Sequence, residues 1–372
     1  MSEWKEHKLG EIISLHRGYD LPSSQRKKGT IPIVSSSGIS DYHDSYKMLP
    51  PGVVTGRYGT IGEVFFLNEP YWPLNTTLYI DDFKGNDPLF IYYFLKSFDF
   101  EKFNDKSTIP GINRNHLYGE VVKIPTDIDE QKRIASILSS LDDKIDLLNR
   151  ENATLEAMAE TLFRQWFIEE AKEDWEERSL IDCIKLVGGG TPTTSNPNYW
   201  NGNIYWLSGG DIASNHKRFA CASAECISNV GLNNSSAKLL PEDAMVVSAR
   251  GTVGKYCLLS KPMTFSQSNY GILPVFDKCY FFTYLLVAFH IEEIQNAAYG
   301  SVFDTITTKT FEGVMVKLPH IDEIIAFEKS ISPYFEKMKQ NEQQIRLISK
   351  QRDMLLPKLM SNEIRNEHYG SK

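Results

Sequence analysis

Side chains of the kind that contact nucleic acids recur in two parts of the chain. Arginine and lysine can bind phosphates and guanine edges, and asparagine and glutamine can bind adenine edges. In the first part, such side chains fall in polar segments that we expect to be loops, and they are Arg26, Lys27, Lys28, Arg57, Tyr58, Asn75, Asn113 and Arg114. In the second part, they are Thr193, Thr194, Lys217, Arg218, Arg250, Gln267, Asn269 and Lys309. Each one alone is equally consistent with an ordinary exposed polar residue, but their recurrence favours a shared binding role.

Two of these residues precede a repeated glycine pattern. Arg57 comes before Gly59-Thr-Ile-Gly62, and Arg250 comes before Gly251-Thr-Val-Gly254, so these two arginines stand out among the candidates. Each pattern predicts a tight turn between strands, with the alternative that its backbone N–H groups face a phosphate. A nucleotide-binding P-loop is excluded, because Gly254-Lys255 is followed by Tyr256 instead of Ser or Thr.

No set of residues requires a reaction to explain it. Adenine methyltransferases carry Asn or Asp followed by Pro-Pro and an aromatic residue, and the nearest strings here are Glu69-Pro-Tyr71 and Asn196-Pro-Asn-Tyr199. The adjacent acids Asp142 and Asp143 are expected to lie on a solvated helix face. We therefore predict no catalytic residue and no enzymatic activity for this chain.

The composition is typical of a globular protein with more than one domain. The chain has 372 residues and a net charge of -8, so any DNA contact must be local or assisted by a partner. The apolar run from Tyr280 to Ile291 is shorter than the roughly 20 residues that cross a bilayer, which predicts a buried helix and no membrane partner. The first residues lack the apolar segment of a secretory signal, so we expect a cytoplasmic protein.

The cysteines do not form a recognisable metal or disulfide pattern. There are five, an odd number, and no two have CxxC spacing. His216, Cys221 and Cys226 are close in sequence, but their spacing suits no common metal site. We expect free thiols and no bound metal.

One structural unit is present twice in the chain. Trp4 to Leu9 returns as Trp175 to Leu180, and Val121-Val-Lys-Ile-Pro125 returns as Met315-Val-Lys-Leu-Pro319. The glycine patterns and two aromatic runs match in the same order, and such ordered matches indicate an internal repeat. The second copy carries extra residues between about 184 and 249. Short apolar runs between polar clusters predict an α+β domain in each copy.

A heptad pattern follows each copy. Apolar residues alternate at spacings of four and three, which is the seam of a coiled coil, over far more than the average helix of about 11 to 12 residues. The first seam, with Ala159 included, comprises Ile134, Leu138, Leu141, Ile145, Leu148, Asn152, Leu155, Leu162 and Trp166. The second, interrupted by Arg352, comprises Phe327, Ile331, Tyr334, Met338, Asn341, Ile345, Ile348, Leu355 and Leu359. We expect the two helices to pair antiparallel, with Asn152 and Asn341 fixing the register at some cost in stability.

The junction between domain and helix resembles that of a known family. The segment from Lys123 to Leu148 (KIPTDIDEQKRIASILSSLDDKIDLL), preceded by Ser107 to Leu117 (STIPGINRNHL), is similar to the junction of target recognition domain and conserved helix in specificity subunits of type I restriction-modification enzymes. The resemblance covers essentially the whole chain. The second copy departs from the pattern, because HIDEIIAF follows Pro319 and the segment from Ser301 to Phe311 lacks Pro-Gly.

The resemblance implies an α+β architecture of two tandem mixed target recognition domains and two long helices that form an antiparallel coiled coil. It implies a first recognition domain at 1–127, a first helix at 128–172, a second recognition domain at 173–319, a second helix at 320–365 and a flexible tail at 366–372. Each domain would read one half of a bipartite double-stranded DNA target. The halves should differ, because Asn75-Thr-Thr stands against Asn269-Tyr-Gly and Pro110-Gly-Ile-Asn against Asp304-Thr-Ile-Thr.

The resemblance also implies partners. Two methyltransferase subunits that bind S-adenosylmethionine would pack against the helices, and a motor-nuclease subunit that uses ATP and Mg would cut, so this chain would bind no cofactor itself. Two alternatives remain open: a coiled-coil scaffold with two protein-binding domains, and an enzyme in its own right.

Overall fold

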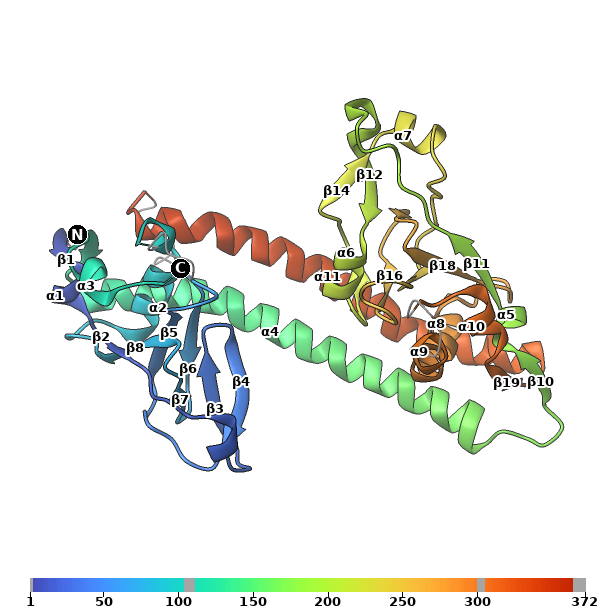
Figure 1. Ribbon diagram of the computed structural model, residues 1–372, viewed down its shortest axis with the longest axis horizontal. Coiled ribbons are helices and arrows are strands. Elements are labelled where there is room, and N and C mark those ends of the chain that lie inside the picture. The colour runs from blue at the N-terminus through green and yellow to red at the C-terminus, as the bar shows by residue number, and fades with distance from the viewer. Residues whose placement is uncertain (1–2, 104–110, 300–304, 364–372) are drawn as a thin grey trace, which may run out of the picture. The chain divides into compact units, whose positions relative to one another are not determined.

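The structure is a computed structural model that describes residues 3–103, 111–299 and 305–363 (Figure 1). The chain divides into two compact units, residues 1–144 with 348–372, and residues 145–347. Each unit holds one globular part together with segments of the long helices α4 (Ile128–Arg164) and α11 (Ile321–Met360). The expected tail at 366–372 and the motif residues 107–110 and 301–304 lie outside the described residues.

The globular part of the first unit contains three sheets. The four-stranded antiparallel sheet has the order β2 (Ser14–Arg17), β8 (Thr77–Asp82), β5 (Gly52–Gly56) and β6 (Val64–Leu67). The three-stranded sheet has the order β4 (Gly38–His43), β3 (Ile31–Ser35) and β7 (Trp72–Pro73), and β1 (Trp4–Lys8) pairs with β9 (Val121–Pro125). The helices here are α1 (Leu9–Ile12), η1 (Ser23–Gln25), α2 (Pro88–Lys96), η2 (Phe100–Phe103) and α3 (Arg114–Tyr118).

The second unit repeats this topology. Its main sheet has the order β11 (Ile184–Gly188), β18 (Asn269–Pro274), β15 (Met245–Ser248), β16 (Tyr256–Leu259) and β13 (Phe219–Ala220). Its three-stranded sheet has the order β14 (Glu225–Ile227), β12 (Trp200–Leu207) and β17 (Thr264–Phe265), and β10 (Glu176–Ser179) pairs with β19 (Met315–Leu318). The helices are α5 (Leu180–Cys183), η4 (Pro197–Tyr199), α6 (Gly209–Ser214), α7 (Asn229–Asn233), α8 (Tyr280–Phe289), α9 (Ile291–Tyr299) and α10 (Thr308–Glu312).

Equivalent backbone hydrogen bonds confirm the duplication. Leu9 N donates to Glu120 O at 2.9 Å, and Leu180 N donates to Val314 O at 2.8 Å. The extra residues of the second copy lie between β12 and β15, where they form α6, β13 and α7. The insertion therefore falls inside the window that the repeat comparison predicted.

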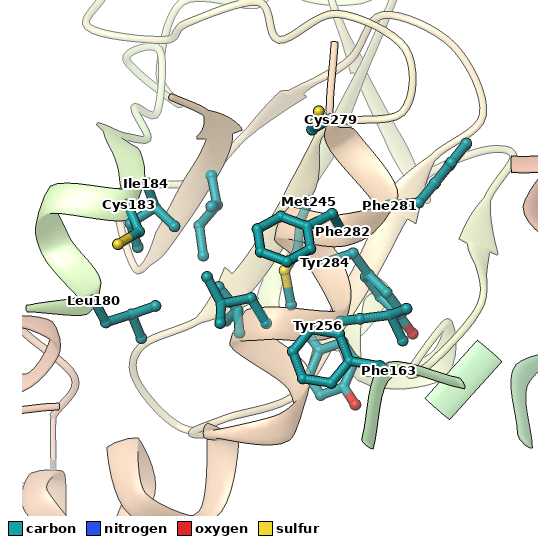
Figure 2. Close-up of a cluster of buried hydrophobic side chains, with 14 of the residues drawn as sticks. Phe163, Leu180, Cys183, Ile184, Met245, Tyr256, Cys279, Phe281, Phe282 and Tyr284 are labelled. Atoms are coloured by element: carbon teal, nitrogen blue, oxygen red, sulfur yellow. The ribbon is translucent and has the colours of Figure 1, made fainter. Parts of the chain in front are cut away.

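Aromatic side chains dominate the core of the second unit. Figure 2 shows Phe163 from α4 and Tyr256 from β16 beside Phe282 and Tyr284 from α8. Helix α8 lies within the apolar run from Tyr280 to Ile291, and most of its side chains are buried, which confirms the expected core helix. Across the described ranges, no helix combines the length and the apolar character that a membrane span requires.

The two long helices pack antiparallel in both units, as the heptad pattern predicted. In the first unit, Ile134 and Leu138 of α4 share a buried cluster with Leu359 of α11. In the second unit, the rings of Phe163 and Phe327 lie 6.0 Å apart. In these contacts, the earlier residues of α4 meet the later residues of α11, and the later residues of α4 meet the earlier ones. After Arg164, the chain continues as a π-helical turn, Gln165–Glu169.

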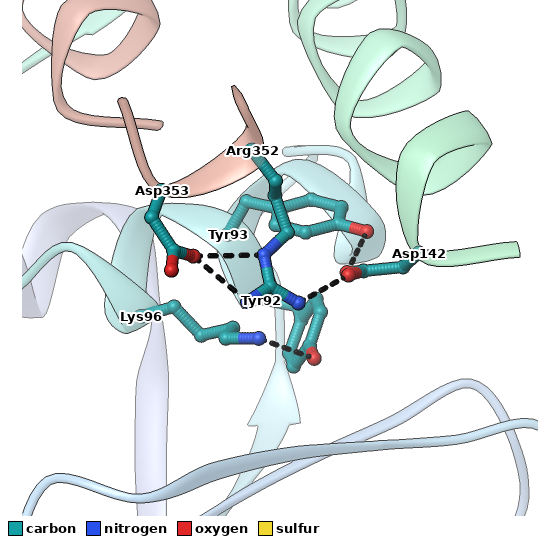
Figure 3. A network of polar contacts seen from close by, with 6 residues as sticks. All are labelled: Tyr92, Tyr93, Lys96, Asp142, Arg352 and Asp353. Carbon is teal, nitrogen blue, oxygen red and sulfur yellow. Dashed lines mark hydrogen bonds and ion pairs between the residues drawn. The ribbon is translucent and has the colours of Figure 1, made fainter. Parts of the chain in front are cut away.

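Arg352 interrupts the second seam and forms a polar network in the first unit (Figure 3). Its Nη1 lies 2.7 Å from Asp142 Oδ1, and Tyr93 OH donates to Asp142 Oδ2 at 2.8 Å. The prediction that Asp142 belongs to a solvated helix face was wrong, because a partly buried guanidinium in the seam needs a carboxylate partner. Asp143 is exposed, as expected.

Candidate nucleic-acid interface

The repeated glycine patterns form the turns that the sequence predicted. The first connects β5 to β6, with positive φ at Gly59 (83°) and Gly62 (87°). The second connects β15 to β16, with positive φ at Gly251 (75°) and Gly254 (78°). Glycine adopts this left-handed backbone without the steric cost that a Cβ would add. A turn with left-handed glycines at equivalent positions is therefore built in both domains.

Hydrogen bonds around the turn show that Arg57 matches Ala249. Arg57 N donates to Thr76 O and Ala249 N donates to Ser268 O, at 2.8 and 3.0 Å. The carbonyl oxygens of Arg57 and Ala249 accept in turn from Ile112 N and Ile306 N. Arg250 consequently takes the place of Tyr58, so the two arginines that precede the matching turns stand one residue apart in the repeat.

The same register pairs Asn75 with Gln267. Strand pairing joins Gly56 to Thr77 in β8, and Ser248 to Asn269 in β18, so Asn269 is the counterpart of Thr77. Asn269 is 1% exposed and donates through Nδ2 to Ser266 Oγ at 2.7 Å. The expected match of Asn75 with Asn269 was wrong, and the burial of Asn269 keeps its amide from a base edge.

The turn brings three of the predicted residues of the first domain together. The Arg57 guanidinium lies 4.6 Å from the centre of the Tyr58 ring, and Tyr58 forms a bridge with Gly111. Asn75 follows β7, and its neighbour Thr76 accepts hydrogen bonds from the N–H groups of both turn residues. We call Arg57, Tyr58 and Asn75 in the first domain, and their exposed counterparts Arg250 and Gln267 in the second, the turn surfaces; the counterpart of Arg57, Ala249, is buried.

Asn113 and Arg114 lie at the start of α3 and make local contacts. Asn113 Oδ1 caps the helix by accepting from Asn115 N at 3.0 Å. Arg114 Nη1 donates to Leu15 O at 3.1 Å. Both side chains therefore stabilise the domain in the structure.

The basic cluster of the first domain lies beside the β3–β4 hairpin. Arg26 forms an ion pair with Asp41 at 3.0 Å, and Lys27 lies 3.9 Å from Asp44. The pKa of Asp41 lies below its ordinary value, because the Tyr42 backbone N–H and then the Arg26 guanidinium bind the carboxylate. Lys28 is exposed. These cations belong to the three-stranded sheet and not to the turn surface.

Lys217 and Arg218 contact the helix pair of the second unit. Lys217 Nζ lies 2.9 Å from Glu160 of α4, and Arg218 Nη2 donates to Asn149 Oδ1 at 2.6 Å. Burial acts to lower the pKa of Lys217, but the hydrogen bond to Glu160 and the charge of Glu156 outweigh it, so the pKa lies above its ordinary value. The structure gives both cations a partner within the unit.

The remaining predicted residues of the second domain are spread over its surface. Thr193 and Thr194 lie in the exposed segment between β11 and η4, and Lys309 is exposed on α10. Gln267 is exposed and bonds to the hydroxyl of Thr191. Of the residues predicted in this domain, Arg250 and Gln267 lie beside the glycine turn, at the positions equivalent to Tyr58 and Asn75.

Sequence reasoning missed Asp20 and Thr191, which contact Asn75 and Gln267 respectively. The sequence has a glycine two residues before each of them, Gly18 and Gly189, and this pair was a usable signal. A Cβ on Gly18 would lie 2.1 Å from Leu74 O, and a Cβ on Gly189 would lie 2.1 Å from Ser266 O, so both positions need glycine. These glycines are separated by the same offset as the matching Trp4 and Trp175.

The structure holds no recognisable metal centre in the residues it describes. Within these ranges, no three His, Cys, Asp or Glu side chains are grouped as a metal ion would need. All five cysteines are free, and Cys183, Cys257 and Cys279 are buried. Burial raises the pKa of the Cys257 thiol to about 12, which makes it unreactive at neutral pH.

Two repeated domains with polar turn surfaces, carried on antiparallel helices, define a tandem recognition protein. The chain belongs to the type I restriction modification DNA specificity domain family, which matches residues 1–157 and 172–351. It is a sequence-recognition subunit of that class, as the resemblance implied. The scaffold alternative is not favoured.

Similar proteins extend over nearly the whole chain. The type I restriction enzyme MjaIX specificity subunit of Methanocaldococcus jannaschii is 24% identical over 415 residues, covering 98% of this chain and 94% of the relative. The HindI specificity subunit of Haemophilus influenzae is 22% identical over 471 residues, covering 98% and 100%. The crystal structure of the type I restriction-modification S subunit from M. genitalium shares the fold, with a TM-score of 0.63, 15% identity and 96% of each chain covered.

Proposed function

We propose that each globular domain reads one half of an asymmetric, bipartite double-stranded DNA sequence. The observation that carries this proposal is the turn surface, which is built twice on the same backbone with different side chains. The first domain presents Arg57, Tyr58 and Asn75 where the second has Ala249, Arg250 and Gln267. Because the arginine stands at a different position in each surface and the amide side chains differ in length, the two halves of the target would differ.

The helix pair would set the distance between the two halves. Helix α4 has 37 residues and α11 has 40, which correspond to about 55 and 60 Å at 1.5 Å per residue. Domains that dock on one face of a duplex prefer centres about 10 to 10.5 base pairs apart. We expect half-sites separated by about one to one and a half helical turns.

An apolar groove on the helices would dock a methyltransferase subunit. Its volume is about 600 Å³, and it is lined by Ala153, Thr154, Ala157, Met158, Thr161, Leu162 and Tyr334. Met158 is a large apolar side chain exposed on the solvent-facing surface of α4, and a partner would cover it. In the alignment of the two seams, Met354 takes the place of Thr161 and is 54% exposed, so the repeat offers a place for a second partner.

Catalysis would belong to the partners. The methyltransferase subunits would bind S-adenosylmethionine and modify the DNA, and a motor-nuclease subunit would use ATP and Mg to cut it. This chain would supply the sequence recognition, as a cytoplasmic component with no cofactor of its own.

Exchange of one domain tests the proposal. Residues 1–127 are replaced by the corresponding domain of a specificity subunit with another target, and the methylated sequences of a genome that carries the complete system are mapped. We expect only one half of the methylated sequence to change, and replacement of residues 173–319 to change only the other half. A change in both halves after either exchange would show that the domains do not read separately.

A further inference from the structure

Asn75 and Gln267 hold equivalent amides in the two turn surfaces, and each amide has a side-chain partner at an equivalent position. Tyr19 N donates to Pro73 O at 2.8 Å, and Gly190 N donates to Phe265 O at 2.9 Å. The residues that follow Tyr19 and Gly190 are Asp20 and Thr191. Asp20 accepts a hydrogen bond from Asn75 Nδ2, and Thr191 bonds to Gln267 Oε1.

The two partners differ in what they allow the amide to do. A carboxylate can only accept, so Asp20 requires the Nδ2 side of Asn75 to face it. If the amide reversed, Oδ1 would face the carboxylate, and the two acceptors would repel. The hydroxyl of Thr191 can donate or accept, so Gln267 can satisfy it in either orientation. Asp20 therefore fixes the Asn75 amide, whereas Thr191 does not fix that of Gln267.

The surroundings keep the Asn75 amide in place without burying it. Asn75 N donates to Tyr19 O at 3.1 Å, which ties the two segments together. Arg17 Nη2 lies 3.8 Å from Asp20 Oδ1 and offsets the carboxylate charge on a surface that would face phosphates. Among the residues that the structure describes, nothing else binds the Asn75 amide, so Oδ1 and the second Nδ2 hydrogen are left for a ligand.

We propose that Asp20 is a positioning residue that holds the Asn75 amide in the orientation that reads an adenine, so that the first domain discriminates sharply at one base position. This inference rests on the proposed function. An amide with a fixed acceptor and donor matches the N6 and N7 edge of adenine. At the equivalent place in the second domain, Gln267 reverses freely and discriminates less.

The experiment uses the complex of this chain with its methyltransferase subunits, and duplexes in which each position of the first half-site is varied in turn. Methylation rates give the preference at each position. Asn75→Ala should remove a preference of about tenfold or more for adenine at one position. Asp20→Asn should weaken the preference at that same position, because an amide partner accepts either orientation of Asn75. In the Asn75→Ala background, Asp20→Asn should have no further effect on preference.

The second domain provides the matched control. Thr191→Asp should sharpen the preference at one position of the second half-site and leave the first half-site unchanged. A merely structural role for Asp20 predicts a uniform loss of methylation over all sequences, and that result would overturn the inference. If the domain exchange alters separate halves but Asn75→Ala changes no single position, the inference fails while the proposed function stands.

Discussion

Asn341 Nδ2 donates to Asn152 Oδ1 at 2.9 Å across the two long helices. Asn152 Nδ2 donates in turn to Glu342 Oε1 at 3.0 Å, and both asparagines are buried. In the alignment of the two seams, Asn341 corresponds to Leu148 and not to Asn152, so the two amides meet only because the helices run antiparallel. A shift of one heptad would bury both amides among apolar side chains. The pair therefore specifies the register of the helices.

Replacing one amide of the pair should destabilise the protein. Asn341→Leu leaves the buried Asn152 Oδ1 without its donor, and we expect the free energy of unfolding in urea to fall by about 1 to 3 kcal/mol. The double variant Asn152→Leu, Asn341→Leu should regain part of this stability, because neither buried amide remains, but Glu342 loses the donor Asn152 and keeps Arg218 at 3.7 Å. Gln343→Leu changes an exposed amide on the same helix and should have little effect. Equal losses for Asn341→Leu and Gln343→Leu would contradict this role.

Glu328 of α11 caps the N-terminus of α8. Its Oε2 accepts from Phe282 N at 2.7 Å and its Oε1 accepts from Phe281 N at 3.2 Å, and α8 has no side-chain cap of its own. Burial raises the pKa of Glu328 to about 7, in spite of these hydrogen bonds. The ordinary pKa of glutamate is about 4.3, so between these values the folded state holds a proton that the unfolded state has released.

This linkage predicts that stability decreases as the pH rises. The contribution of Glu328 is complete below about pH 4.3 and is lost as the pH passes through about 7, with a slope of up to about 1.4 kcal/mol per pH unit. Glu328→Gln should flatten this slope in urea unfolding between pH 5 and pH 7. Glu156, whose pKa burial also raises to about 7, should leave a residual slope of the same sign. Glu336→Gln, at an exposed position of α11, is the control, and an equal effect of both variants would refute the assignment.

The helices could be predicted from sequence because their seam repeats over many turns. The ion pair of Arg352 with Asp142 could not be predicted, because these residues come into contact only once both helices have packed. The turns were predictable from their glycines, but the counterpart of Asn75 was not, because only the strand pairing of β8 and β18 shows that Asn269 corresponds to Thr77. The sequence does not distinguish Lys217 from a lysine in an exposed loop, and only the packed structure shows that it contacts Glu160.

Arg250 and Arg218 should affect DNA binding differently. Arg250 is exposed on the turn surface, whereas Arg218 bonds to Asn149 and lies 3.7 Å from Glu342. In the complex with methyltransferase subunits, Arg250→Ala should weaken binding of the target duplex. If Arg250 contacts a phosphate, the slope of log affinity against log salt should fall by about one; if it contacts a guanine edge, preference at one position of the second half-site should relax. Arg218→Ala should leave both quantities unchanged and lower the free energy of unfolding. Identical binding by the two variants would place the DNA surface elsewhere.

Met158 tests the docking groove. It is 44% exposed on α4, so Met158→Glu should leave the free energy of unfolding nearly unchanged. If a methyltransferase subunit covers the groove, the variant buries an unpaired carboxylate in that interface, and affinity should fall by about tenfold or more. Native mass spectrometry should then show complexes with one methyltransferase subunit in place of two, because the surface around Met354 is intact.

The second position distinguishes a local effect from a general one. Met354→Glu should remove the other methyltransferase subunit, and the double variant should bind neither. Lys144→Glu reverses the charge of an exposed residue on α4 outside the groove and should leave both subunits bound. If Met158→Glu still binds two subunits with unchanged affinity, the groove is not the docking surface. If Lys144→Glu loses subunits as readily as Met158→Glu, net charge and not the apolar groove governs assembly.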